Sequence, residues 1–148
     1  MNLSKNFTLN ELTHTDTGLT NEPDDAQKEK LLYLATYVLQ PIRDRWGGIK
    51  VTSGYRSTAV NAAIGSTPHS QHLFGEAADF VPLVAGVSVS QKLDSIFAWL
   101  VSESGIPFGQ CIRETSGSRQ WIHVSLPRLN AANQDALVYD GKDYKSYL

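Results

Sequence analysis

The stretch Gln110-Cys-Ile-Arg-Glu-Thr-Ser-Gly-Ser-Arg-Gln-Trp-Ile-His-Val-Ser-Leu126 contains two segments with the composition of β-strands. Residues 110–114 and 120–126 are predicted as strands, the second of them rich in Trp, Ile and Val, and Ser116 to Arg119 has the composition of a four-residue hairpin loop. Strands joined by so short a loop pair antiparallel. We therefore predict an α+β fold in which helices flank a small antiparallel sheet.

The length of this loop also predicts which side chains share a face of the hairpin. If residues 116–119 form the loop, the opposing pairs are Thr115 with Gln120, Glu114 with Trp121, and Ile112 with His123. Glu114 and His123 then lie on one face as diagonal neighbours, and Gln120 points to the other face. A slip of one residue would reverse these faces, so this assignment depends on the register.

The rest of the chain reads as an alternation of helices and short strands, without internal repeats. A Thr-x-x-Glu capping box and apolar residues at steps of three and four predict helices, and Gly and Pro interrupt them. The expected helices lie near Glu11 and Leu12, over residues 25–46 with a possible kink at Pro41, over 58–64, and from a cap at Ser88 or Ser90 to about 104. The further strands are expected at residues 49–52 and 77–81.

The size and composition of the chain are those of one domain. It has 148 residues, of which 41% are hydrophobic, so we expect a single domain over residues 1–148 with its core at about 7–126 and a polar C-terminal tail at 127–148. The formal net charge is −2 with both signs mixed along the chain, which argues against a nucleic-acid partner. The single cysteine, Cys111, excludes an internal disulfide and a Cys-rich zinc site.

The chain start, MNLSKNFTLNEL, lacks the apolar stretch of a secretory signal peptide. No segment approaches the ~20 apolar residues that span a bilayer, so membrane insertion is not expected. We expect a monomer that is made in the cytoplasm. A substrate outside the cytoplasm would then require cell lysis, a phage or prophage system, or a separate export route.

Three side chains have the types needed for a catalytic metal site. His72 and Asp79 are separated by six residues, and the chain must double back for both to reach one ion, a bend that Gly75 permits. His123 is the best remaining imidazole for a third ligand. Two His and one Asp leave a fourth position for water, as in catalytic rather than structural zinc sites. Each residue also has an alternative without a metal: His72 as a polar loop residue, His123 as a hydrogen-bonded strand histidine, and Asp79 as a solvated carboxylate. The spacing alone is a weak pattern.

The surrounding residues make the pattern specific. Ser70-x-His72-x-x-Gly75-x-Ala77-x-Asp79, preceded by Ser53-Gly54-Tyr55-Arg56-Ser57 and followed by Trp121-x-His123, resembles the M15 zinc D,D-peptidases. These are D-Ala-D-Ala carboxypeptidases and peptidoglycan endopeptidases, including phage endolysins, and the resemblance covers about Phe7 to Leu126. It implies Zn²⁺ on His72, Asp79 and His123, and Arg56 placed to contact substrate. It also implies the compact fold shared with the hedgehog signalling domain.

The sequence departs from the family at one position. Many members carry a catalytic Glu or Asp three residues before the last zinc histidine, where this chain has Gln120. An amide cannot accept a proton as a carboxylate does, so either another acid serves or the chemistry is impaired. We predict Glu114 as that acid, with an exposed strand carboxylate as the alternative reading.

The resemblance implies a cell-wall hydrolase. The expected reaction is hydrolysis of peptidoglycan stem or cross-link peptides by a metal-activated water, with Glu114 as acid and base. Two alternatives stay open: a weakly active or inactive zinc-containing wall-binding or phage structural module, and a metal-free protein with residual motifs.

Further residues have expected roles beside this chemistry. Arg56 suits a substrate carboxylate or carbonyl, or else an ordinary ion pair. Ser70 and Trp121 are expected at the substrate, although an aromatic on a strand more often packs. His69 and Ser70 could orient the first ligand, or be plain loop residues. Cys111, on the face opposite Glu114, is predicted to be a small apolar filler.

Overall fold

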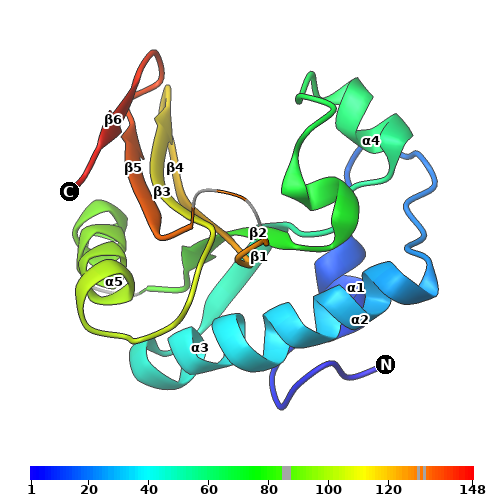
Figure 1. Cartoon of the computed structure of the whole chain (residues 1–148), viewed down its shortest axis with the longest axis horizontal. Helices are drawn as coiled ribbons and strands as arrows, with labels where there is room; N and C mark the ends of the chain where they lie inside the picture. Colours follow the sequence, from blue (N-terminus) through cyan, green and yellow to red (C-terminus); the bar gives the residue numbers. More distant parts are fainter. Residues whose placement is uncertain (85–87, 130, 132) are drawn as a thin grey trace. The chain divides into compact units, whose positions relative to one another are not determined.

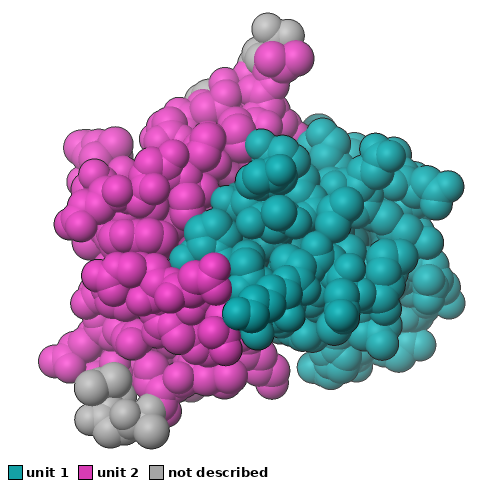
Figure 2. All heavy atoms as spheres, turned by 90° about the horizontal axis from the view of Figure 1, so that it is seen from below, with its two compact units in different colours: residues 1–41, 51–78 teal, residues 42–50, 79–148 magenta. Residues whose placement is uncertain are grey.

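The computed structural model describes residues 1–84, 88–129, 131 and 133–148. Contacts along the chain divide it into two compact units, one of residues 1–41 and 51–78 and the other of residues 42–50 and 79–148 (Figure 2). The α+β class is confirmed, with helices and one sheet of six strands. The single functional domain over residues 1–148 stays a prediction.

The helices follow the predicted pattern closely. Thr8 caps the first helix, because its hydroxyl accepts a hydrogen bond from the backbone N–H of Glu11, as in the predicted capping box. Ser57 caps the helix after the Ser-Gly-Tyr-Arg segment in the same way. The helices and helical turns of residues 1–78 are α1 Leu9–Thr13, α2 Asp25–Leu34, η1 Ala35–Leu39, α3 Gln40–Trp46, α4 Thr58–Ala63 and η2 Gln71–Phe74.

Helices α2, η1 and α3 form the continuous helical run that the sequence predicts over residues 25–46. The pattern does not predict that η1 is a π-helical turn, in which the N–H of Gln40 bonds to the carbonyl of Ala35. The turn directly precedes Pro41, whose ring would clash with the carbonyl four residues earlier in a regular α-helix, so a wider turn relieves the clash. Within the described residues, no helix is both long and apolar enough to cross a bilayer.

The sheet is mixed rather than purely antiparallel. Strands β3 and β4 pair antiparallel, β5 lies parallel to β3, and β6 pairs antiparallel with β5 (Figure 1). The strand order is β1-β2-β4-β3-β5-β6. The strands are β1 Ile49–Ser53, β2 Ala77–Pro82, β3 Gln110–Ser116, β4 Arg119–Ser125, β5 Asp135–Tyr139 and β6 Tyr144–Ser146.

The expected polar tail after residue 126 therefore contributes two strands to the sheet. Ala136 is buried, and Gln134 joins the start of β5 to Phe108 by one backbone and one side-chain hydrogen bond. Polar residues dominate this segment, which obscures the apolar run Ala136 to Val138 in the sequence. The predicted turn at Asp140-Gly141 is present, and it connects β5 to β6.

The predicted register of the β3–β4 hairpin is confirmed. Glu114 lies opposite Trp121, and Ile112 lies opposite His123. The loop is tighter than predicted, because Ser116 and Arg119 already form a pair and only two residues connect them. Gly117 has a positive φ of 61°, a conformation that glycine adopts without steric cost.

Helix α5, Val89–Ser102, packs against the face of β3 and β4 opposite Glu114 (Figure 1). Ser88 caps it, and its apolar stripe is buried through Leu93, Ile96, Phe97 and Leu100. On the same face, Arg113 of β3 forms an ion pair of 3.0 Å with Asp94 of α5. The polar link and the apolar stripe together hold the helix on the hairpin.

Cys111 lies on this same face and is fully buried, as predicted for a small apolar filler. Burial raises the pKa of its thiol well above the ordinary value, because the charged thiolate would lose its hydration. We expect folded protein to resist alkylation by iodoacetamide even at about pH 9, where an ordinary thiol of pKa ~8.5 reacts. Mass spectrometry should detect one alkylated cysteine only after urea unfolding, and rapid labelling of the folded chain would contradict this burial.

Candidate metal centre

His72 is held by the short helical turn η2. Its side chain is buried with 2% of its surface exposed, and its Nδ1 lies 2.7 Å from the carbonyl oxygen of Gly54. Because a carbonyl oxygen only accepts, Nδ1 carries the proton and donates, which leaves the lone pair on Nε2. This tautomer is the one in which Nε2 can bind a metal ion.

The segment Ser53 to Arg56 wraps around this ligand. The backbone N–H of Arg56 donates to the carbonyl of His72 at 3.0 Å, while the carbonyl of Gly54 accepts from the His72 ring. Position 54 has no space for a side chain, since a Cβ there would overlap the backbone oxygen of Leu12. The Ser-Gly-Tyr-Arg motif therefore orients the first ligand through main-chain groups.

Gly75 closes the turn that carries His72, as the sequence predicts. Its φ of 73° lies in the left-handed region, and its N–H bonds back to the carbonyls of Gln71 and His72. A Cβ would also lie 2.6 Å from the backbone oxygen of Gln27. The chain doubles back here and enters β2, which places Asp79 after His72.

Asn21 supports the same loop, and sequence reasoning did not identify it. Its amide nitrogen donates to the carbonyls of Thr13 and Tyr55, at 2.8 and 2.9 Å, and its oxygen accepts from the N–H of Ser57 at 2.6 Å. The side chain is 8% exposed. An asparagine in a polar stretch gives no sequence signal of this role, because its three partners are backbone groups far along the chain.

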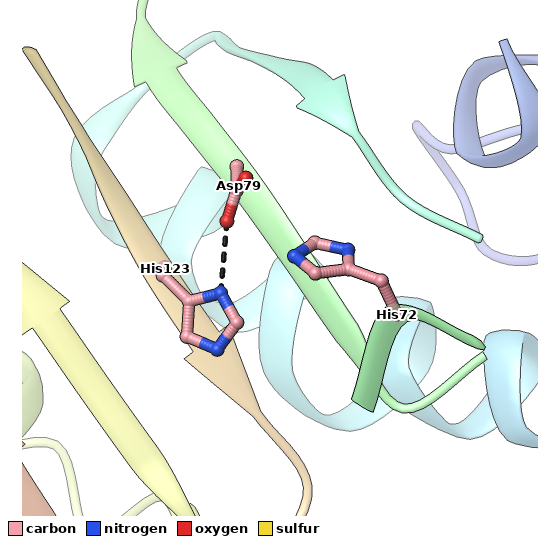
Figure 3. Close-up of side chains that lie close together, drawn as sticks. All are labelled: His72, Asp79 and His123. Atoms are coloured by element: carbon pink, nitrogen blue, oxygen red, sulfur yellow. Dashed lines mark hydrogen bonds and ion pairs between the residues drawn. The ribbon is translucent and has the colours of Figure 1, made fainter. Parts of the chain in front are cut away.

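Asp79 on β2 and His123 on β4 contact each other directly. Their Oδ1 and Nδ1 atoms are 2.9 Å apart, and the side chains are 11% and 12% exposed. Figure 3 shows the two side chains pointing toward each other, with the ring of His72 beside them. The bond joins the Nδ1 edge of the His123 ring to the carboxylate.

His72, Asp79 and His123 form the one group of three potential metal ligands found among the described residues, with ligand atoms all within 4.8 Å of one another. Ligands about 2.0–2.2 Å from a single zinc ion have donor atoms within about 4 Å of each other, so small side-chain shifts would bring these atoms onto one ion. Two imidazoles and one carboxylate are suitable donors for a divalent transition metal. The convergence expected from the sequence is confirmed, and the group can bind a metal ion.

Glu114 lies half-buried on the His123 face of the hairpin. Its Oε2 accepts a hydrogen bond of 2.7 Å from the indole Nε1 of Trp121, the residue opposite it on β4. The carboxylate is therefore held in position by an aromatic neighbour. Trp121 thus has a structural role beside Glu114, and its predicted contact with substrate stays a prediction.

Gln120 points to the other face, as the register predicts. Its side-chain oxygen accepts a hydrogen bond of 2.6 Å from Arg113, the arginine that also pairs with Asp94 of α5. The amide at this position thus belongs to the contact between the hairpin and α5. Gln120 therefore has a structural role here, as a hydrogen-bond acceptor for Arg113.

The other predicted residues have defined places within the first unit. The guanidinium of Arg56 donates to the hydroxyls of Ser53 and Ser66, at 2.9 and 3.4 Å. Ser70 caps η2, since its hydroxyl accepts from the backbone N–H of His72 at 3.3 Å. His69 is exposed. The ring of His72 is therefore oriented by Gly54, whereas Ser70 acts on its backbone.

Replacing Asn21 with alanine should destabilise the protein by about 2–3 kcal/mol, because two carbonyls and one N–H would lose buried hydrogen bonds. Urea unfolding followed by circular dichroism measures this loss. Asn10→Ala, at an exposed position of α1, is the matched control and should change the free energy of unfolding by less than about 0.5 kcal/mol. Equal effects of the two substitutions would contradict the role of Asn21.

Comparison with known proteins places this geometry in a family. The sequence matches the family model described as Peptidase M15 over residues 5–125. No curated protein matches the chain. The matched segment covers most of the chain and contains the three converging side chains, Glu114 and the loop around Gly54. The chain therefore belongs to the peptidase M15 family and is a metallopeptidase by membership.

Proposed function

We propose that the protein is a zinc peptidase that hydrolyses peptidoglycan stem or cross-link peptides, as a D-Ala-D-Ala carboxypeptidase or endopeptidase. The observation that carries the proposal is the group of His72, Asp79 and His123, whose ligand atoms lie within 4.8 Å of one another in a chain of the M15 family. Two imidazoles and one carboxylate make the donor set of a catalytic rather than a structural zinc site. The substrate class rests on the resemblance of the motifs to D,D-peptidases.

The donor atoms suggest how these residues would hold zinc. His72 would bind through Nε2, because its Nδ1 donates to Gly54, whereas Asp79 and His123 would bind through the oxygen and nitrogen that now contact each other. When bound, zinc supplies a Lewis acid that lowers the pKa of water to about 7 and polarises a carbonyl. The Gly54 carbonyl would fix the His72 ring and raise its basicity, because it accepts the proton on the ring nitrogen that does not face the metal.

Glu114 would carry the proton in this reaction. It would take a proton from the attacking water and deliver it to the departing amine, the usual path of a general base that becomes a general acid. The Trp121 N–H would keep one carboxylate oxygen in place and direct the other toward the reacting groups. Position 120 would then need no acid.

Arg56 would bind the substrate. Its guanidinium is always charged and presents a planar fork, which matches a terminal carboxylate in a carboxypeptidase or a carbonyl in an endopeptidase. The hydroxyls of Ser53 and Ser66 hold the side chain, and its backbone bond to His72 ties it to the metal ligand. The charge of Arg56 and its place in the loop that contacts His72 therefore favour a role in substrate binding.

A second candidate is a zinc-containing wall-binding or phage structural module without turnover. Gln120 favours it, because this amide occupies the position where many family members carry the acid. Glu114 decides between the two candidates, since a hydrolase depends on it and a binding module does not.

The affinity for zinc should depend on His72 and not on the nearby His69. We expect wild-type protein to bind one zinc ion per chain, and His72→Ala to lower the affinity by at least ~100-fold because one of the three protein ligands is lost. Isothermal titration of metal-free protein and elemental analysis measure this. His69→Ala, three residues away and exposed, should bind like wild type; zinc binding that survives His72→Ala would refute the assignment.

Glu114→Gln should abolish turnover and keep zinc. The amide retains the shape of the side chain and cannot accept a proton, so we expect kcat to fall by about 10²–10⁴. The assay is mass-spectrometric digestion of defined muropeptides ending in D-Ala-D-Ala or containing a D-Ala cross-link, which reports activity and bond choice together. Intact muropeptides with the zinc-loaded wild type would favour the binding module, and full activity of Glu114→Gln would remove Glu114 from the mechanism.

A further inference from the structure

A row of side chains extends from the catalytic carboxylate across the C-terminal strands. Trp121, Glu114, Tyr139 and Tyr144 are successive partners on β4, β3, β5 and β6. Paired residues point to the same side of a sheet, so all four lie on the His123 face. The Trp121–Glu114 bond and the tyrosine ring contact confirm this for each half of the row.

The two tyrosines end this row as an open aromatic surface. Their ring centroids are 4.5 Å apart with the planes tilted by 35°, and Tyr144 is 58% exposed. The opposite face of the same strands is covered differently, because Tyr147 packs its ring against Phe97 of α5 at 4.8 Å. Tyr139 and Tyr144 thus lie on the functional side, outside the packing between the sheet and α5.

This surface lies in a negative environment. Partial burial raises the pKa of the Tyr144 phenol, and the neighbouring charge of Glu114 raises it further, so this carboxylate acts electrostatically on the ring. Lys145, next to Tyr144 on β6, lies opposite Val138 and therefore points to the α5 face. Aromatic faces are themselves electron-rich and attract ammonium groups whatever metal is bound nearby.

We propose that Tyr139 and Tyr144 form a subsite for an amino-bearing side chain of the substrate peptide, near the bond that is cut. The methylene stem of a lysine-like residue would lie along the rings, and its ammonium would meet the ring faces and the charge of Glu114. The inference rests on the proposed peptidase function and adds a preference at one substrate position. Residues after 125 lie outside the family match, so this subsite is a feature of this chain's own C-terminal segment.

The spacing of the strands gives the position of that residue. Neighbouring strands lie about 5 Å apart, so Tyr139 is one strand and Tyr144 two strands, roughly 10 Å, from Glu114. An extended peptide advances about 3.4 Å per residue. The subsite should therefore receive a side chain two or three residues from the scissile bond, with no need for the distant sugar of a muropeptide.

The test compares peptides that differ only in one charge. Acetyl-X-D-Ala-D-Ala peptides with X as lysine, Nε-acetyl-lysine or norleucine are given to the zinc-loaded wild type, and kcat/KM is measured. The same peptides are titrated calorimetrically into the Glu114→Gln variant, which reports binding without turnover. We expect lysine to be preferred over acetyl-lysine about two- to fivefold in kcat/KM, the size of a cation–π contact at an exposed site. The titration should show a smaller preference in the same direction, because Glu114→Gln keeps the two rings and lacks the carboxylate charge.

Variants assign that preference to the rings. Tyr144→Leu, alone and with Tyr139→Leu, keeps an apolar side chain but removes the π face, and the preference should fall to about one. Tyr144→Phe keeps the face and should keep the preference. Tyr37→Leu is the matched control, since Tyr37 is 59% exposed and forms a similar ring pair with Tyr33, at 4.6 Å, on the α2–η1 run.

The outcomes separate this inference from the proposed function. Cleavage of all three peptides at equal rates, or a lysine preference that survives both leucine substitutions, overturns the subsite while the peptidase stands. A loss confined to disaccharide-bearing muropeptides in Tyr144→Leu also overturns it, in favour of a sugar. Absence of cleavage together with a ring-dependent lysine preference in the calorimetric titration overturns the D,D-peptidase and supports the subsite.

Discussion

The antiparallel register of β3 and β4 is the constraint on which the functional face depends. Because side chains alternate across a strand, the pairing of Ile112 with His123 places His123 and Glu114 on the same side. A slip of β4 by one residue would bring Gln120 to the face of Glu114 and turn His123 toward α5. The hairpin resists that slip on both faces, through the Trp121–Glu114 bond on one and the Arg113 contacts to Gln120 and Asp94 on the other.

The first ligand is oriented by a different principle. His72 sits on a short turn, and its ring is fixed by the backbone carbonyl of Gly54 rather than by another side chain. Such an arrangement needs a glycine where the loop passes Leu12, and a left-handed glycine at position 75 where the chain returns toward Asp79. Asn21 holds the loop of residues 53–57 through its hydrogen bonds to the backbone of Tyr55 and Ser57. Gly54 and Gly75 thus position His72, because Gly54 leaves room for close backbone contact and Gly75 adopts the left-handed conformation of the turn.

Local patterns predicted most of the helices, the hairpin and the three converging side chains, because capping boxes, apolar periodicity and short loops act within a few residues. Three features were not predicted by these patterns. The π-turn before Pro41 reflects a clash within the helix, Asn21 bonds to backbone groups far along the chain, and the strands β5 and β6 have a composition that reads as a polar tail. The pairing of β5 with β3 and of β6 with β5 is seen only in the folded sheet.

The unpredicted strands also change how the functional face can vary. A strand added at the edge of a sheet extends every row of side chains by one position, and it leaves the register of the existing strands unchanged. Here the parallel pairing of β5 with β3 continues the row from Glu114 to Tyr139, and β6 continues it to Tyr144. The metal ligands and the carboxylate lie inside the segment shared with the family, whereas the two tyrosines lie beyond it. Substrate preference can therefore change at positions 139 and 144 while the geometry of His72, Asp79 and His123 is preserved.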